Sequence, residues 1–195
     1  LGGLIAAGSA LAVRRGLAAA PRPAFVASGP GFAFDTGVLR GTLRGDGQSK
    51  GLLPVLDAAT GTPLARSLGW FSPYRLLDDQ HRFGKAAWDW PSTARLLPNG
   101  AVEVRWAADD GHPLDLAAVY RWSAPNVLDF SIRVTARRAL CRLEVFLATY
   151  FEGFPHTVVL AGDAANFVSA PRSAGEWQMF PRDEAATRII TDGRW

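Results

Sequence analysis

The residues best suited to chemistry lie in one aromatic-rich stretch, 70–92. This stretch contains, in order, Tyr74, Arg75, His81, Trp88 and Asp89. Aromatic rings pack against the apolar C–H faces of a sugar ring, while Arg and Asp form charge-assisted hydrogen bonds with hydroxyls or uronate carboxylates. We therefore predict a carbohydrate-binding surface made by Tyr74, Arg75, Trp88 and Asp89. The alternative is that the rings fill the hydrophobic core of the domain.

The spacing of the two neighbouring tryptophans gives a geometric expectation. Trp88 and Trp90 have Asp89 between them. In an extended strand, successive side chains point to opposite faces. If this segment is extended, both indole rings lie on one side and the Asp89 carboxylate on the other.

A second set of polar residues interrupts the apolar stretch 142–151. With strand periodicity, one face carries Glu144, Phe146, Ala148, Tyr150 and Glu152. A carboxylate on an otherwise apolar strand must be paired, protonated or placed in a wet cleft. Glu144 is thus a candidate base or sugar ligand, with a salt bridge to Arg142, Arg121 or Arg133 as the alternative. Glu144 and His81 are the candidate catalytic residues, and whether the chain is an enzyme stays open.

Other kinds of site find little support in the sequence. The three histidines are isolated from one another, without the i, i+2 or i, i+4 spacing of metal ligands. The single cysteine, Cys141, excludes a disulfide within the chain and a cysteine-based metal centre. Its apolar neighbours predict a small buried residue. We predict no metal site and no cofactor.

The net charge and the N-terminal segment limit which partners and which cellular compartment we expect. The net charge is +3, and the arginines are spread along the chain instead of forming a basic run, so we predict no nucleic-acid binding. The apolar stretch 1–13 is too short to span a bilayer, so we expect no stable membrane insertion. Residues 1–20 are either part of a signal segment, or an Ala-rich helix or mistranslated leader. The first alternative leads us to favour the periplasm or secretion slightly over the cytoplasm. The oligomeric state stays open.

From residue 31 onward, the pattern is typical of an antiparallel β-sandwich. Asn99 and Gly100 predict a hairpin turn, followed by the alternating strand 101–106. Short apolar runs separated by turn residues predict further strands at 32–36, 37–40, 51–56, 114–122, 127–134, 142–151 and 157–160. Residues 183–190 have the composition of a short helix. We expect a leader and Pro-rich linker at 1–30 and one β-sandwich domain at 31–195, truncated at its C-terminus.

Four short motifs carry a family resemblance. They are Gly51-Leu-Leu-Pro-Val55, Ser72-Pro-Tyr-Arg75, Trp88-Asp-Trp-Pro-Ser92 and Glu144-Val-Phe-Leu-Ala-Thr-Tyr-Phe151. Together they resemble uncharacterised bacterial proteins of the galactose mutarotase-like β-supersandwich, over about residues 32–195. The resemblance implies a supersandwich domain that binds or acts on carbohydrate, as epimerases, polysaccharide lyases and glycoside hydrolases of this superfamily do. The epimerases use a His pair and a downstream Glu base. No His pair matches here, and the Glu would lie beyond Trp195.

The sequence therefore leaves three functions open. Carbohydrate recognition is the leading hypothesis. The second is a structural or protein-interaction domain in which the aromatic rings are core residues. The third is an epimerase- or lyase-type enzyme with Glu144 or His81 as the base.

Overall fold

The computed structural model describes residues 23–45, 47–160, 167–171, 173, 178–181 and 183–191. In these residues the chain is mainly β, with several antiparallel sheets and one short α-helix, α1 (Glu184–Thr191). The prediction of a mainly β, antiparallel fold is confirmed. No helix in this part of the chain is long and apolar enough to cross a membrane. The expected leader, 1–20, lies outside the described residues.

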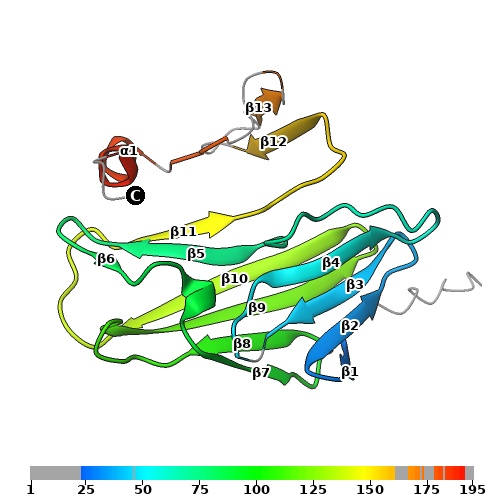
Figure 1. Ribbon diagram of the computed structural model, residues 1–195, viewed down its shortest axis with the longest axis horizontal. Coiled ribbons are helices and arrows are strands. Elements are labelled where there is room, and N and C mark those ends of the chain that lie inside the picture. The colour runs from blue at the N-terminus through cyan, green and yellow to red at the C-terminus, as the bar shows by residue number, and fades with distance from the viewer. Residues whose placement is uncertain are drawn as a thin grey trace, which may run out of the picture.

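Two four-stranded sheets form most of the molecule (Figure 1). The first contains, in order, β1 (Val26–Ser28), β2 (Gly31–Asp35), β3 (Leu39–Arg44) and β4 (Gly51–Asp57). The second contains, in spatial order, β10 (Val127–Ala136), β9 (Leu114–Ala124), β8 (Val102–Trp106) and β7 (Ser92–Leu96). Every strand pair in both sheets is antiparallel.

Two smaller sheets complete the described fold. One has the order β11 (Glu144–Ala148), β5 (Ser72–Leu77) and β6 (Arg82–Phe83). The other pairs β12 (His156–Leu160) with β13 (Phe167–Pro171). In Figure 1, the β12–β13 pair and α1 lie on the far side of β11 from the two large sheets. A 3-10 helix, η1 (Ala87–Asp89), follows β6 and lies beside β5.

One hydrophobic core joins three of these sheets. The fully buried side chains that they contribute include Leu43, Leu52 and Val55, then Val104, Trp106 and Tyr120, then Leu76. Along β9 every second residue is buried, from Leu114 to Trp122. This is the period-2 pattern of a strand with one face on the core. Burying each aliphatic side chain stabilises the fold by roughly 1.5–3 kcal/mol, so the core holds the three sheets in one arrangement.

The predicted hairpin turn is confirmed between β7 and β8. Gly100 has φ of +77°, a conformation that favours glycine, and its N–H donates to the Leu97 carbonyl at 2.9 Å. A Cβ at this position would lie 2.7 Å from the Ala24 Cβ. The Gly100 carbonyl accepts a hydrogen bond from the Phe25 N–H at 3.0 Å. The turn therefore also fixes the point where the chain enters the first sheet.

The solvent face of the β7–β10 sheet carries ion pairs both between neighbouring strands and within one strand. Glu103 on β8 accepts a hydrogen bond from the Nε of Arg95 and another from the Nε of Arg105, each at 2.7 Å. The hydrogen bond from Arg105 has the largest effect on the pKa of the Glu103 carboxyl and lowers it. Burial opposes it, and Arg95 adds to it, so the pKa of the carboxyl falls to about 2. On the neighbouring strands, Arg121 pairs with Asp129.

Two expectations about local structure need correction. The segment 21–30, expected to be a linker, contains β1, and Phe25 is only 2% exposed. Phe25 packs edge-on against Phe34 with ring centres 5.7 Å apart. Burying this aromatic ring in the core stabilises the fold more than leaving it exposed in a linker would. Cys141, expected to be buried, is exposed. It lies in the bend between β10 and β11, where its neighbours Leu140 and Leu143 pack against the core instead.

Candidate functional site

The start of β5 is held in an unusual backbone conformation next to the predicted site residues. Phe71 has φ of +53°, in the left-handed region that non-glycine residues rarely adopt. Its N–H donates to the Thr149 hydroxyl at 3.2 Å, and its carbonyl accepts from the Tyr120 hydroxyl at 2.7 Å. Tyr120 is completely buried, and this burial raises the pKa of its phenol. The phenol therefore stays protonated and keeps the first residues of β5 in place.

Tyr74 occupies a β-bulge in β5. On β11, Phe146 lies opposite Arg75 and the next residue, Leu147, lies opposite Pro73, which leaves Tyr74 as the extra residue. A bulge interrupts the alternation of side chains and redirects one of them. This explains why two adjacent residues touch. The Arg75 Nη2 donates to the Tyr74 hydroxyl at 2.6 Å, and its guanidinium carbon lies 4.5 Å from the centre of the Tyr74 ring.

Trp88 comes to the same place from η1. Its indole stacks on the Tyr74 ring, with centres 4.5 Å apart and planes 14° from parallel. The 3-10 turn of Ala87–Asp89 makes this possible, because it brings the chain back toward β5 after β6 has ended. Trp88 remains half-buried, and Asp89 at the end of the turn is exposed. Three of the predicted site residues, Tyr74, Arg75 and Trp88, are thus in direct contact.

Two further aromatic residues belong to this group. The Phe146 ring lies 5.8 Å from that of Tyr74. The Tyr150 phenol has a raised pKa, first because of burial and then because of the nearby Tyr74 phenol, with Arg75 acting in the opposite direction. We call Tyr74, Arg75, Trp88, Phe146 and Tyr150 the aromatic–arginine cluster. The sequence had placed Phe146 and Tyr150 on the face of Glu144 without naming them as site residues, and that shared periodicity was the available signal.

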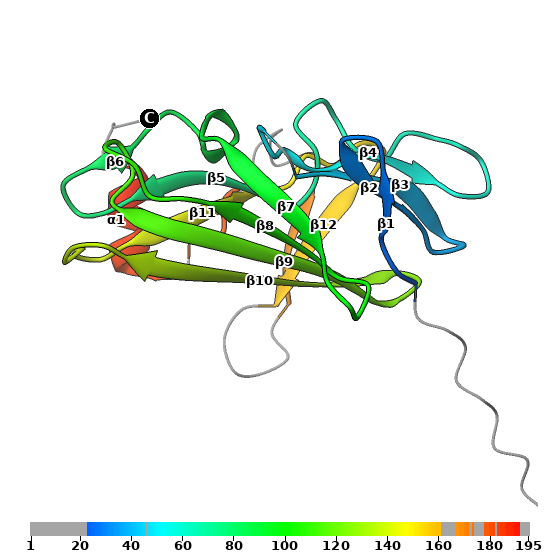
Figure 2. The same cartoon turned by 90° about the horizontal axis from the view of Figure 1, so that it is seen from below.

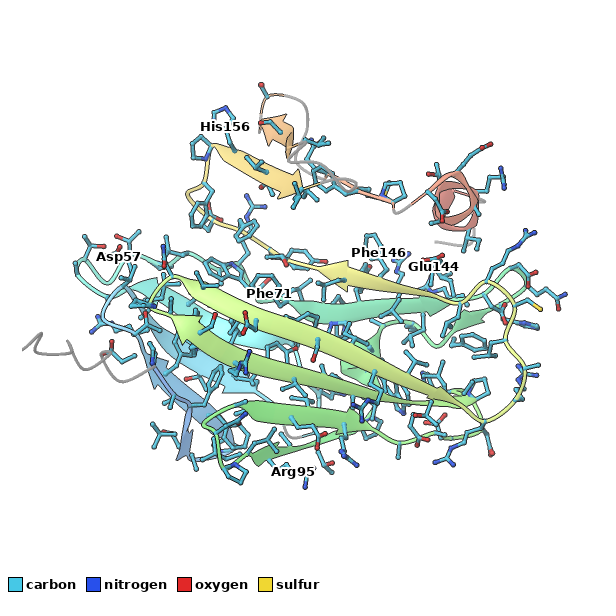
Figure 3. The ribbon with its side chains drawn as sticks, turned by 180° about the vertical axis from the view of Figure 1, so that it is seen from behind. Asp57, Phe71, Arg95, Glu144, Phe146 and His156 are labelled. Carbon is cyan, nitrogen blue, oxygen red and sulfur yellow. The ribbon has the colours of Figure 1, made fainter. Side chains whose placement is uncertain are left out.

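Glu144 lies on the same strand and face as Phe146. Glu144 pairs with Leu77 and Phe146 pairs with Arg75 across β11 and β5, and directly opposed residues share a face. Figure 3 shows both side chains along β11. Leu77 packs against Ile189 of α1, so the helix lies beside this end of the face. Of the arginines expected as alternative partners for Glu144, Arg121 is paired with Asp129.

His81 lies apart from the cluster. It sits in the turn between β5 and β6, where its Nδ1 is 3.3 Å from the buried Asp78 carboxylate and its side chain is 54% exposed. The Asp78 carboxylate also accepts hydrogen bonds from the N–H groups of Gln80 and His81. The ring of His81 stacks near Phe83 at 6.1 Å. These contacts give His81 a role in closing the β5–β6 turn, away from the contacts around Tyr74.

Trp88 and Trp90 were expected on one side of the chain if their segment was extended, and the segment is not extended. Because η1 is a 3-10 turn, the two rings point to different environments. Trp90 is 2% exposed, donates its indole N–H to the Ala107 carbonyl at 2.9 Å, and stacks on His112 at 4.1 Å. His112 in turn contacts the Asp109 carboxylate through Nδ1 at 2.8 Å. Trp90 is therefore a core residue, and only Trp88 belongs to the cluster.

The cluster combines two kinds of contact that a polar ligand with an apolar face requires. The half-buried rings offer apolar surface, and the Arg75 guanidinium and the two phenols offer hydrogen-bond donors. Within the described residues, no group of three or more His, Cys, Asp or Glu side chains is placed to hold a metal ion. The chain matches no protein-family model, no curated protein and no solved structure.

Proposed function

We propose that this chain recognises carbohydrate through the aromatic–arginine cluster, on a domain of the galactose mutarotase-like β-supersandwich type. The observation that carries the proposal is the contact of Trp88, Tyr74 and Arg75 at the β5 bulge. The supersandwich assignment rests on the short motifs of the sequence and on the antiparallel sheets that share one core. Its link to sugar binding is an analogy from fold.

The geometry of the cluster supports a sugar more than an entirely apolar ligand. A pyranose has an apolar C–H face that packs on an aromatic ring and a rim of hydroxyls that need partners. Trp88 is half-buried and the neighbouring Asp89 is exposed, so η1 carries a ring and a carboxylate at adjacent positions. Arg75 and the Tyr74 hydroxyl supply donors next to the same rings. A site of this kind is aromatic at its rim and polar at its floor.

Glu144 supports a second candidate, an epimerase- or lyase-type activity. The supporting observation is its position two residues from Phe146 on the face that carries Arg75. A general base has to lie within hydrogen-bond reach of the proton that it removes. In this proposal the sugar lies on the cluster and extends along β11 toward Glu144. His81, in the β5–β6 turn and bound to Asp78, is the weaker of the two candidate bases.

A glycan array tests the proposal. The full chain is applied to the array, and any glycan that binds it is then titrated in solution. Trp88→Ala is expected to weaken binding at least about fivefold, because the stacking of a nucleic-acid base on an aromatic side chain contributes about 1–3 kcal/mol and we expect a similar value for a sugar face. Asp89→Asn is expected to weaken it several-fold. Binding that survives both substitutions places the site elsewhere.

Matched controls separate binding from stability. Phe154→Ala removes a 41%-exposed aromatic residue that contacts Trp70 and Phe151 instead of the cluster. Asp110→Asn removes an exposed carboxylate in the turn after β8. Both are expected to bind as the unsubstituted chain does. Absence of glycan binding, together with a large loss of thermal stability in both Trp88→Ala and Asp89→Asn, would favour the structural role of the aromatic rings.

A further inference from the structure

β10 is the edge strand of the β7–β10 sheet, and it has few of the usual protections of an edge. It has a single strand neighbour, β9, and Figure 2 shows it along the margin of the sheet. Proteins protect such edges with proline, lysine, bulges or very short strands, because the outer row of N–H and C=O groups can pair with another chain. Val127–Ala136 contains no Pro, Gly or Lys, and its only irregularity lies between Val127 and Leu128 at its beginning.

The inner face of β10 is incompletely covered. Leu128, Phe130, Ile132 and Val134 all contact the core, yet each remains only partly buried. On the adjacent β9, the inner residues Leu116, Ala118 and Tyr120 are buried almost completely. The difference follows from position, because β9 has a strand on each side and β10 has one. A further strand beside β10 would remove this apolar surface from water.

The outer face of β10 is complementary to itself. Asp129, Ser131 and Arg133 follow one another on this face, with Ser131 at the centre. When two copies of β10 run antiparallel about a two-fold axis at Ser131, Asp129 of each copy lies opposite Arg133 of the other. Opposite charges placed directly across a strand pair stabilise it, and like charges destabilise it. On the inner face the same register places Phe130 opposite Ile132 and Leu128 opposite Val134.

Neighbouring registers are less favourable. Directly opposed residues must share a face of the sheet. The two-fold axis can therefore lie at other residues of β10, but not midway between two residues, because that would place inner side chains opposite outer ones. An axis at Phe130 or Ile132 places Arg133 opposite Val127 or Ser131 and leaves the charges without direct partners. An axis at Asp129 or Arg133 places two like charges against each other. The register centred on Ser131 therefore has the best charge complementarity.

Arg133 is available for this pairing. It is exposed, and within the described part of the chain it makes no ion pair or side-chain hydrogen bond. Asp129 is held on its own strand pair by Arg121 and by the Ser123 hydroxyl, with its side chain 44% exposed. A second arginine from another copy would therefore meet a carboxylate that is already fixed in position.

We propose that β10 forms a homodimer with β10 of a second copy, antiparallel and with the two-fold axis at Ser131. The interface is isologous, as a two-fold dimer requires. One strand per partner is smaller than the roughly 20–30 residues per side of a standard interface, so we expect dissociation constants on the order of micromolar. The proposal does not depend on carbohydrate binding.

Sedimentation equilibrium over a range of protein concentrations tests the dimer. The full chain is expected to shift from monomer to dimer between about 1 and 100 micromolar. Arg133→Asp places a carboxylate opposite Asp129 twice per dimer and is expected to raise the dissociation constant at least tenfold. The charge-matched control is Arg138→Asp, at an exposed arginine beyond the end of β10, which should leave it unchanged. A chain that stays monomeric at all concentrations, or equal effects of the two variants, overturns the proposal.

Disulfide trapping tests the register and does not depend on the stability of the charge variants. In a Cys141→Ser background, Ser131→Cys puts two cysteines across the axis, where Cα atoms of opposed residues lie about 4.5–5.5 Å apart and a disulfide can form. Thr135→Cys on the same face is the control, because its two copies would be roughly 26 Å apart. We expect a covalent dimer from Ser131→Cys alone under mild oxidation. Equal trapping of both variants, or trapping of neither, refutes the pairing.

Discussion

Replacing Glu103 by Gln tests the strongest electrostatic feature of the fold. The side chain of Glu103 is only 12% exposed and lies between the guanidinium groups of Arg95 and Arg105. Its hydrogen bonds with Arg105, and after them those with Arg95, lower the pKa of the carboxyl from 4.5 to about 2 against the effect of burial. Gln keeps the shape of the side chain and removes the charge, so the substitution isolates the ion pairs.

The size of the effect follows from the pKa. A fall from 4.5 to about 2 corresponds to at most about 3 kcal/mol between the two protonation states. The arginine side chains are 62% and 57% exposed, so water and salt screen much of this interaction. Exposed ion pairs contribute about 0–1 kcal/mol each, and two arginines share this carboxylate. We expect Glu103→Gln to lower the free energy of unfolding at pH 7 by about 1 kcal/mol.

The dependence on pH has a defined sign. Because the folded-state pKa lies below that of the unfolded chain, the carboxylate stabilises the fold fully above about pH 4.5, and this contribution is lost as the pH falls toward 2. Urea unfolding of both proteins at pH 7 and at several values down to pH 2.5 measures it. The difference between them should stay constant from pH 7 to about pH 4.5 and then shrink as the pH falls further. Glu184→Gln is the control, since Glu184 pairs with Arg188 on the surface of α1 with its side chain 88% exposed. A difference that stays constant over the whole pH range would refute the electrostatic explanation.

Three further predictions concern backbone space, the cysteine and the N-terminus. Gly41→Ala should destabilise the fold by about 3 kcal/mol in thermal unfolding, because the new Cβ would lie 2.0 Å from the Pro54 carbonyl oxygen, whereas Gly111→Ala meets only an ordinary contact at 3.5 Å and should change little. Cys141 is exposed, so it should react with a thiol reagent in the folded protein at the rate of an unhindered thiol, and protection until unfolding would contradict this. Removing residues 1–20 should leave the melting temperature within about two degrees of the starting value, and a further deletion through Phe25 should lower it clearly, because Phe25 is in the core.

Strand positions could be predicted from the sequence where one face of a strand is buried. Val102, Val104 and Trp106 alternate with polar residues, and all three are buried on β8. The same periodicity correctly indicated most of β10, and β9 was predicted as an apolar run between turns. Among the described strands, sequence reasoning gave no range for β1, β5, β6, β7 and β13. In β5 the pattern runs buried, buried, half-buried, half-buried, buried, buried, because the bulge at Tyr74 shifts the alternation by one residue.

The candidate site was less predictable because it too depends on local structure that interrupts the strand periodicity. Tyr74, Arg75 and Trp88 were selected by residue type, and the structure brings these three together. Their contact depends on a bulge and on a single turn of 3-10 helix, neither of which has a periodic signature. His81 was selected by residue type as well, but its backbone and ring are bound to Asp78 in a turn. Residue type alone could not distinguish these cases.

The contrast between Trp88 and Trp90 shows how the fold separates stability from recognition within three residues. Trp90 is buried, with its indole N–H bound to the Ala107 carbonyl and its ring on His112, so its removal would leave both a cavity and an unpaired carbonyl. Trp88 is half-buried and contacts Tyr74 through one ring face. Removing Trp88 loses a stacking interaction of about 0.5–1.5 kcal/mol, in addition to the stabilisation from the area that the ring buries. A variant at position 88 therefore keeps enough of the fold to test binding, and a variant at position 90 does not. Substitutions of the half-buried Trp88 and the exposed Asp89 on η1 are consequently those that can change binding with the least loss of the fold.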